Sequence, residues 1–246
     1  MPELPEAERA REAIERAVGR EIVAVDDNDP YVTRPHSPGE FSAALVGHRL
    51  ESAHRRGKFL WAETSGPTLG LHLGMAGRIA IDEPPERWDR FALEFADGGR
   101  LALKDKRRLG RALLEPDFSH VGPDAAEVSR DEFRLRIHRS GTPIKARLMD
   151  QGAISGIGNL LADEVLWRAR MSPWRPANSL SVDELDALRR VIRATVRDAV
   201  KNGGVHTGKF MPSRKRGGVC PREGASLRLD TVGGRTTLWC PVCQLG

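Results

Sequence analysis

The first residues of the chain carry groups that could act as a nucleophile and a proton carrier. Removal of Met1, which is usual before a small residue, would leave Pro2 with a free secondary amine. An α-amino group has a reference pKa of about 7.7–8.0, so a useful fraction is unprotonated near neutral pH. Glu3 beside it could move protons. Entry into a helix is the competing explanation, and it accounts for Pro5 and Glu6 but not for Pro2 and Glu3.

The three cysteines indicate a local site near the C-terminus, since an odd number argues against a framework of disulfides. Cys240 and Cys243 form a CxxC pair, and Cys220 lies upstream at the spacing of a zinc ribbon. A four-cysteine site would need a cysteine where the chain has Glu223. A carboxylate can bind zinc, so the prediction is one structural zinc ion on three cysteines and Glu223. A metal-free hairpin held by packing is the alternative, and no organic cofactor is indicated.

Three short motifs have the composition of a nucleic-acid interface. Lys58 follows a glycine and precedes an apolar strand, where it could contact phosphate or donate a proton. Met75 in "LHLGMAGR" is suited to a turn that projects an apolar wedge into a base stack. "LKDKRRLGR" surrounds Leu109 with cations, Arg107 among them. A solvated surface explains the cations equally well, and a core position explains Met75.

Two further motifs could bind phosphate. "QGAISGIGN" ends with Asn159 at the expected start of a helix, where free backbone amides attract anions. "VGGRTT" places Arg235 at the expected tip of a hairpin.

The whole chain has the composition of a globular protein with a polyanionic partner. It has 246 residues, a formal net charge of +5 and a hydrophobic fraction of 39%. It contains no apolar run long enough for a membrane span and no signal peptide at its start, so we expect a cytoplasmic protein. A basic surface without a partner remains the alternative.

The elements that must position these residues fall into a strand-rich part and a helical part, which predicts an α+β fold. Short apolar segments such as "EIVAVDD", "FLWAET" and "RFALEFADGG" occupy the first 120 or so residues and suggest a sandwich or barrel. Helices follow, one of them opened by Thr142 as a cap with Pro143 in its first turn. The clearest helix starts with the capping box of Ser181 and Glu184 and stops at Gly203.

In this order the motifs resemble the formamidopyrimidine-DNA glycosylase / endonuclease VIII family of DNA repair enzymes. The resemblance spans almost the whole chain and comprises "MPELPE", "RRGK", "LHLGM", "DKRRLG", "IKARLMDQ", "GIGN", "ADE" and "VGGRTTLWCPVCQ". It implies a catalytic β-sandwich with a flanking helix over residues 1–122 and a helix–two-turn–helix domain over 123–209. A zinc-finger-like β-hairpin would cover 210–246, with DNA bound in the cleft between the domains.

The resemblance also implies a bifunctional glycosylase and lyase acting on damaged double-stranded DNA. Pro2 would attack C1′ of a flipped nucleotide and displace the base, and elimination through the resulting iminium would cut the strand on both sides. Glu3 would move protons at the sugar, Glu6 would help hold the lesion, and Lys58 would contact phosphate and assist proton transfer. The void left by the flipped base would be filled by Met75, Arg107 and Leu109. The backbone around the lesion would be held by Lys145, Asn159 and Arg235.

The chain departs from the family pattern at three places. Leu109 stands where close relatives often have Phe, and Glu223 replaces a cysteine. The segment 204–220 is short and lacks the expected "VYGR". The start of the chain favours the branch that removes 8-oxoguanine and formamidopyrimidine lesions, whereas the short segment favours the endonuclease VIII branch and oxidised pyrimidines. An abasic-site lyase without base selection and a non-catalytic binder of damaged DNA are further alternatives, and we expect a monomer.

Overall fold

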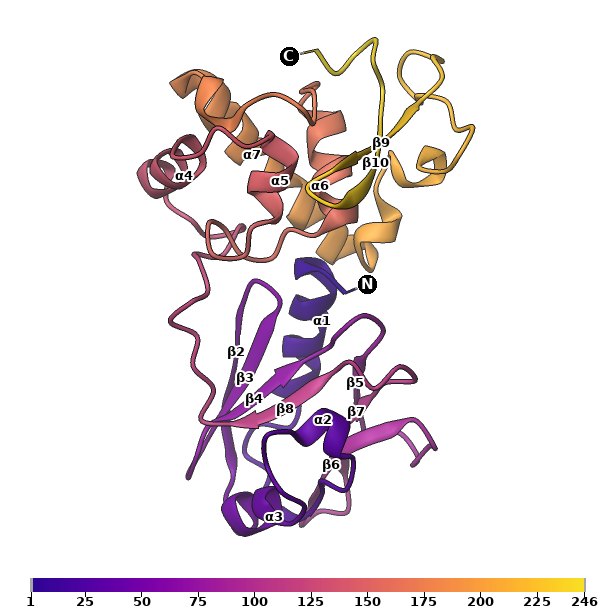
Figure 1. Ribbon diagram of the computed structural model, residues 1–246. Helices are drawn as coiled ribbons and strands as arrows, with labels where there is room; N and C mark the ends of the chain where they lie inside the picture. Colours follow the sequence, from indigo (N-terminus) through magenta and orange to yellow (C-terminus); the bar gives the residue numbers. More distant parts are fainter. Residues whose placement is uncertain (1, 246) are drawn as a thin grey trace. The chain divides into compact units, whose positions relative to one another are not determined.

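The N-terminal part of the protein is a β-sandwich flanked by a helix, seen in the computed structural model, which describes residues 2–245 (Figure 1). Pro2 and residues 7–118 form one unit, and residues 3–6 and 119–245 form the other. The elements from the start to residue 118 are α1 (Leu4–Glu15), β1 (Ile22–Asp26), α2 (Pro30–Thr33), α3 (Glu40–Leu45), β2 (Leu50–Arg56), β3 (Phe59–Thr64), β4 (Leu69–His72), β5 (Arg78–Ile81), β6 (Asp89–Phe95), β7 (Arg100–Lys104) and β8 (Arg111–Leu114).

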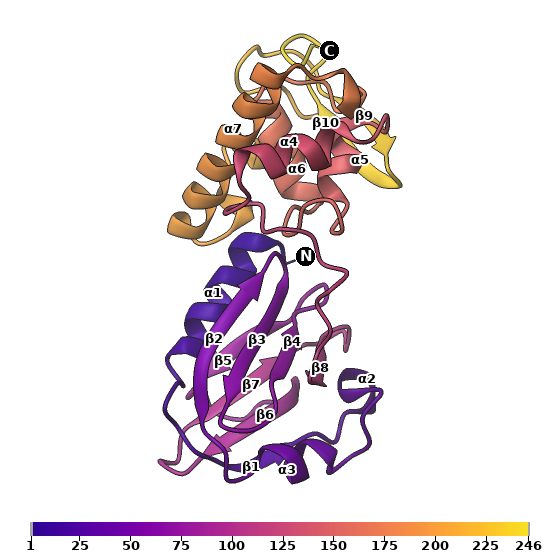
Figure 2. The ribbon, with the colours of Figure 1, turned by 90° about the vertical axis from the view of Figure 1, so that its left-hand side faces the viewer.

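Two four-stranded antiparallel sheets make up the sandwich. Their strand orders are β1-β6-β7-β5 and β2-β3-β4-β8. Figure 2 shows the second sheet in front of the first, with α1 along one side. The buried alanines and Ile14 of α1 join one core with the apolar residues of both sheets, among them Leu60, Leu71, Phe91 and Leu103. This confirms the predicted sandwich, because the alternating segments place one apolar face of each strand inward.

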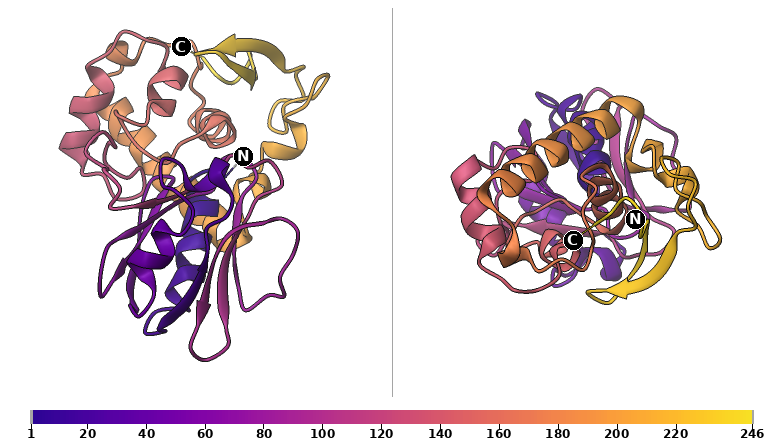
Figure 3. Two further views of the ribbon diagram at one scale, coloured as in Figure 1. Left: turned by 60° about the horizontal axis from the view of Figure 1, so that its bottom comes forward. Right: turned by 90° about the horizontal axis from the view of Figure 1, so that it is seen from above.

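The second unit is helical and ends in a hairpin. Its elements are α4 (Arg130–His138), α5 (Ile144–Met149), α6 (Asn159–Arg168), η1 (Ala177–Ser179), α7 (Val182–Asn202), η2 (Val205–Thr207), η3 (Met211–Ser213), β9 (Arg228–Val232) and β10 (Arg235–Trp239). The views of Figure 3 show α4 beside the long helix α7, with the hairpin β9–β10 on the other side of α6. The predicted α+β class, with two helices joined by turns and a terminal hairpin, is confirmed.

The ends of the helices follow local sequence rules in one case and depart from them in another. At α7, Ser181 and Glu184 form the predicted capping box, and Gly203 ends the helix with a φ of 104°. At α5 the predicted cap is wrong, since Pro143 takes the N-cap position and no side chain caps the helix. The hydroxyl of Thr142 instead bonds the hydroxyl of Ser140.

The hairpin has a small core of its own, which packs on the end of α6. Trp167, Phe210, Leu238 and the three cysteines form this cluster. Among residues 2–245, no helix has both the length and the apolar character needed to cross a bilayer.

Candidate functional site

Glu3 is fully buried and caps the N-terminus of α6. Its carboxylate accepts hydrogen bonds from the backbone amides of Gly158 at 3.0 Å, Leu160 at 2.9 Å and Leu161 at 2.9 Å. These are the orphan donors at the positive end of a helix, which favour a negative charge. A Cβ on Gly158 would overlap the Glu3 carboxylate, so this glycine provides the space that the contact needs.

Glu6 fixes the same segment from the other side. One carboxylate oxygen accepts the backbone amide of Glu3 at 2.9 Å, and the other accepts the amide of Val205 at 2.7 Å. Gly204, whose φ is 137°, leaves room for this oxygen. The two glutamates therefore anchor the residues directly after Pro2, and Pro2 itself is half-buried. Met1, whose removal the nucleophile hypothesis requires, lies outside the described residues.

Lys58 lies in the β2–β3 turn of the first unit, and the structure adds a histidine to its surroundings. Burial lowers the pKa of His72, and the charges of Lys58 and Arg111 lower this pKa further. The neutral ring accepts the backbone amide of Gly74 on its Nδ1 at 3.0 Å. His72 was not among the predicted site residues, although its place just before the "LGM" turn was an available signal.

Met75 and Leu109 are brought together in the first unit. Gly74, in the left-handed region with a φ of 58°, packs directly on the backbone of Leu109, and a Cβ there would overlap it. The Met75 and Leu109 side chains are nevertheless 41% and 39% exposed. Arg107 is exposed on the same loop. Two exposed apolar residues on turns that pack against each other at Gly74, with an exposed arginine two positions from Leu109, are unfavourable in water and suited to contact with a nucleic acid.

Lys145 is fully buried, unlike the exposed lysines and arginines of the second unit. Its ammonium lies 2.7 Å from an oxygen of Asp163 and donates to Thr236 O at 3.1 Å and Thr237 Oγ1 at 2.7 Å. Arg214 Nε donates to the second oxygen of Asp163 at 2.7 Å. Burial lowers the pKa of Lys145 and raises the pKa of Asp163, against the attraction between them. This cluster joins the hairpin strand β10 to helices α5 and α6.

Asn159 and Arg235 occupy the other expected phosphate positions. Asn159 is the first residue of α6, and its Oδ1 is buried without a hydrogen-bond partner among residues 2–245. Arg235 begins β10 after the turn of Gly233 and Gly234, which have φ of 57° and 70°, and it is exposed. A Cβ on Gly233 would lie 2.9 Å from the Cβ of Ala146, so this turn packs closely on α5.

The three cysteines form one buried cluster, and their sulfur atoms all lie within 4.8 Å of one another. The Sγ atoms of Cys220 and Cys243 are 3.8 Å apart. Tetrahedral zinc with Zn–S bonds of about 2.3 Å places its sulfurs about 3.8 Å apart, so three thiols here fit three corners of a zinc site. Glu223 is exposed and is not part of the cluster.

Arg222, rather than its neighbour Glu223, approaches the thiols. Its Nη1 lies 3.3 Å from Cys243 Sγ, and its guanidinium lies over the ring of Trp167 at 4.3 Å. Burial acts to raise the pKa of Cys220, but hydrogen bonds from Trp167 and nearby backbone amides outweigh it and lower the pKa to about 7. Burial and the neighbouring thiols raise the pKa of Cys243 to about 12. The predicted fourth ligand is therefore not in place, because the turn presents Arg222 to the cluster.

Comparison with known proteins covers the whole chain. Residues 1–112 match the family model of the formamidopyrimidine-DNA glycosylase N-terminal domain, and residues 121–210 match that of the formamidopyrimidine-DNA glycosylase H2TH domain. Formamidopyrimidine-DNA glycosylases from a Nocardioides species and a Roseiflexus species are 37% and 36% identical to this chain. The alignments cover 99% of this chain in both cases, and 94% and 100% of the relatives.

A solved structure matches the fold along its full length. It is a complex of Lactococcus lactis Fpg with DNA containing N7-benzyl-Fapy-dG. Its TM-score is 0.87 at 30% identity, with 100% of both chains covered. A complex of the same enzyme with abasic-site DNA matches with a TM-score of 0.86 at 30% identity, covering 99% of this chain and 100% of the other.

Proposed function

Because this chain belongs to the formamidopyrimidine-DNA glycosylase family, a family of base-excision repair enzymes, we propose that it removes oxidised purines of the 8-oxoguanine and formamidopyrimidine type from duplex DNA. We further propose that it cuts the strand at the resulting site. The observation that carries this proposal is the double anchoring of Glu3 and Glu6. It holds the residues next to Pro2 in one place, as an N-terminal nucleophile requires.

In this mechanism the Pro2 nitrogen attacks C1′ of the damaged nucleotide. The bond from C1′ to the base breaks, and the base leaves with the electron pair and takes up a proton. Opening of the sugar ring gives an iminium between Pro2 and C1′, which acidifies the proton on C2′. Loss of that proton breaks the bond from C3′ to its phosphate oxygen, which leaves with the electron pair. Loss of the C4′ proton in a second elimination then breaks the bond from C5′ to its phosphate oxygen. Water then adds to C1′ of the iminium, and the bond from C1′ to nitrogen breaks to give an aldehyde and free Pro2.

The other residues act on charge and position. Glu3, whose carboxylate lies at the N-terminus of α6, moves protons at the sugar. Lys58, beside the neutral His72, contacts phosphate near the reacting nucleotide. Met75, Arg107 and Leu109 fill the space left by the extruded nucleotide. Asn159 and Arg235 hold the backbone, a role that positions DNA without reading its sequence. Cys220, Cys240 and Cys243 would hold a zinc ion whose role is to stabilise the hairpin.

Trapping with borohydride tests the proposal. The protein is mixed with duplexes that carry 8-oxoguanine, an oxidised pyrimidine or an abasic site, and sodium borohydride reduces any imine to a stable adduct visible on a gel. We expect an adduct with 8-oxoguanine and with the abasic site. A protein with one extra residue before Pro2 is the matched control, because an amide nitrogen cannot form the imine.

The other outcomes each point to a different function. An adduct with the oxidised pyrimidine but not with 8-oxoguanine would identify the endonuclease VIII branch, which the short segment 204–220 favours. An adduct with the abasic site alone would identify a lyase without base selection. No adduct on any duplex would exclude Pro2 as the nucleophile and leave a DNA-binding protein. The mass of the purified chain checks separately that Met1 has been removed.

A further inference from the structure

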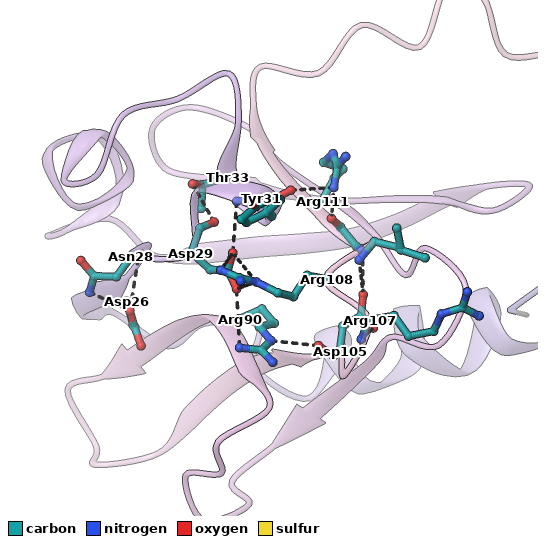
Figure 4. A network of polar contacts seen from close by, with 12 residues as sticks. Asp26, Asn28, Asp29, Tyr31, Thr33, Arg90, Asp105, Arg107, Arg108 and Arg111 are labelled. Carbon is teal, nitrogen blue, oxygen red and sulfur yellow. Dashed lines mark hydrogen bonds and ion pairs between the residues drawn. The ribbon is translucent and has the colours of Figure 1, made fainter.

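The loop that carries Arg107 and Leu109 contains a residue that points the other way. Arg108 has a φ of 55°, a left-handed conformation that a side chain makes unfavourable. Figure 4 shows the side chains of Arg107 and Arg108 extending in opposite directions from the loop. A strained residue of this kind persists only where the surrounding contacts hold it in place.

The contact that holds Arg108 is a two-pronged ion pair with Asp29. Arg108 Nε lies 2.8 Å from Oδ2 of Asp29, and Nη2 lies 2.9 Å from Oδ1. The Arg108 guanidinium also lies over the Tyr31 ring, 4.4 Å from its centroid. An arginine fork on a carboxylate fixes direction as well as distance, so it can select one conformation of the loop.

Asp29 is itself held firmly. It is only 9% exposed and caps the short helix α2, where its Oδ1 accepts the Tyr31 amide at 3.1 Å. Arg90 adds a second charge 3.6 Å from Oδ2. The carboxylate is therefore a fixed point in the first unit, to which the loop is attached across 79 positions of sequence.

The base of the loop is fixed independently by Asp105. Its buried carboxylate accepts the backbone amides of Arg107 at 2.9 Å, Leu109 at 2.7 Å and Gly110 at 2.8 Å. Arg111 donates to the Tyr31 carbonyl at 2.7 Å, so α2 holds the loop at two points. Asp105 sets the turn, while the contacts to α2 set the angle at which the turn leaves the sandwich.

We infer that Asp29, acting through Arg108, is a positioning residue that holds Arg107 and Leu109 in the direction needed to enter the DNA. This inference rests on the proposed function, because it takes the two loop side chains to fill the space left by an extruded nucleotide. Arg108 uses its charge on Asp29 rather than on phosphate. Loss of Asp29 therefore impairs insertion of the loop even though it frees a cation on the DNA-binding loop.

The test measures binding of the full chain to a duplex with a tetrahydrofuran abasic analogue and 2-aminopurine as the opposite base. The analogue cannot form an imine, so this readout does not depend on the Pro2 chemistry. The fluorescence of 2-aminopurine reports whether side chains enter the stack beside it. We expect Asp29→Ala and Arg108→Ala each to weaken the preference for this duplex over undamaged DNA by about tenfold and to reduce the fluorescence change.

Three variants separate positioning from the alternatives. If Asp29 acts through Arg108, the double variant is no worse than either single variant. Arg108→Lys keeps the positive charge but cannot form the two-pronged pair with Asp29. We therefore expect it to recover less than half of the preference for the damaged duplex that Arg108→Ala loses. Asp97→Ala is the matched control, because Asp97 forms the same two-pronged pair with Arg20, at 2.8 and 2.9 Å, elsewhere in the first unit. It leaves the preference and the fluorescence unchanged.

Other outcomes overturn the inference in distinguishable ways. If Asp29→Ala binds like the wild type while Arg108→Ala binds weakly, Arg108 contacts DNA directly and Asp29 has no positioning role. If Asp29→Ala and Arg108→Ala both bind like the wild type, the loop keeps its direction without the ion pair of Asp29 and Arg108. Both results leave the proposed function intact, since the wild type still selects the damaged duplex. If the wild type shows no preference and forms no adduct with borohydride, the proposed function and this inference fall together.

Discussion

The carboxylate of Glu3 accepts the backbone amide of Gly158 at 3.0 Å, although the two residues are 155 positions apart. The contact ties the start of the chain to the first turn of α6, so the geometry around Pro2 depends on residues in the second half of the protein. Substitutions there test this dependence without touching the proposed nucleophile.

Gly158→Ala is expected to disturb the position of Pro2. The backbone of Gly158, with φ of −117° and ψ of −164°, suits any residue, so the cost of the alanine is steric and falls on the Glu3 carboxylate. We expect a loss of about 1–3 kcal/mol in the free energy of unfolding. Borohydride trapping should slow by about a hundredfold, because small misplacements of reacting groups are costly. Gly141→Ala, where the nearest atom to a new Cβ would be 3.4 Å away, is the control.

Lys145→Met is expected to lower stability rather than weaken phosphate binding. Removing the ammonium leaves Asp163 buried with Arg214 alone, which should cost about 3 kcal/mol in the free energy of unfolding. Urea unfolding measures this, with the exposed Lys201→Met for comparison. If Lys145 holds a DNA phosphate, the slope of log affinity against log salt also falls by about 0.9.

Arg235→Ala is expected to reduce that salt dependence. An exposed guanidinium at the start of β10 that neutralises one phosphate contributes about 0.9 to the slope, without preference for sequence. The slope is measured by titrating a damaged duplex with the protein at several salt concentrations from low to moderate. Arg228→Ala removes an exposed arginine from the same hairpin, so an equal change in both variants would point to net charge rather than a specific contact.

His72 should make the protein less stable in mild acid. Its folded pKa is lowered, chiefly by burial, so the unfolded chain binds a proton below about pH 6.5 while the folded protein stays neutral until lower pH. The unfolded state then binds more protons, and the free energy of unfolding falls as pH drops, by at most about 1.4 kcal/mol per pH unit. His72→Gln should reduce the change in the free energy of unfolding between pH 7 and 5, measured by urea unfolding at each pH. The exposed His138→Gln is the control for the loss of a histidine as such.

Glu223→Cys should strengthen zinc binding at the cysteine cluster. Among residues 2–245, the cluster supplies three thiols for a tetrahedral site. The Glu223 carboxylate is not part of the cluster, but the backbone of residue 223 hydrogen-bonds the Cys220 thiol, so a cysteine at this position is placed to supply the fourth thiolate. We expect the variant to retain zinc at chelator concentrations at least about tenfold above those that strip the wild type. Glu223→Ser separates the thiol from the loss of the carboxylate, and equal retention in all three proteins would mean that position 223 is not a ligand position.

The sequence predicted the parts of the fold that local rules determine. Strands β1, β3 and β6 were found because their apolar residues alternate or cluster between turn residues, and α7 was found through its capping box. Strand β2 was not selected, since "LESAHRR" is largely polar and gains its place by pairing with β3.

The contacts that determine the site could not be read in the same way. The burial of Lys145 depends on Asp163 and on the hairpin, which local spacing does not reveal. The ion pair of Asp29 and Arg108 joins a short helix to a distant loop. Glu223 was expected at the metal because only its spacing was visible, and the direction of the turn that presents Arg222 instead was not.

The hydrogen bonds that anchor Glu3 and Glu6 also bear on when Met1 can be removed during synthesis of the chain. The partners of Glu3 are added 155 to 158 positions later, and the Val205 partner of Glu6 is 199 positions away. At translation rates of about 5–20 residues per second, the start of the nascent chain stays without the partners of Glu3 for roughly 8–30 seconds. An aminopeptidase at the ribosome can trim Met1 in that interval, before Glu3 and Glu6 have their partners. Removal of Met1, which the proposed Pro2 nucleophile requires, thus has a time window set by the number of residues that separate Glu3 and Glu6 from their partners.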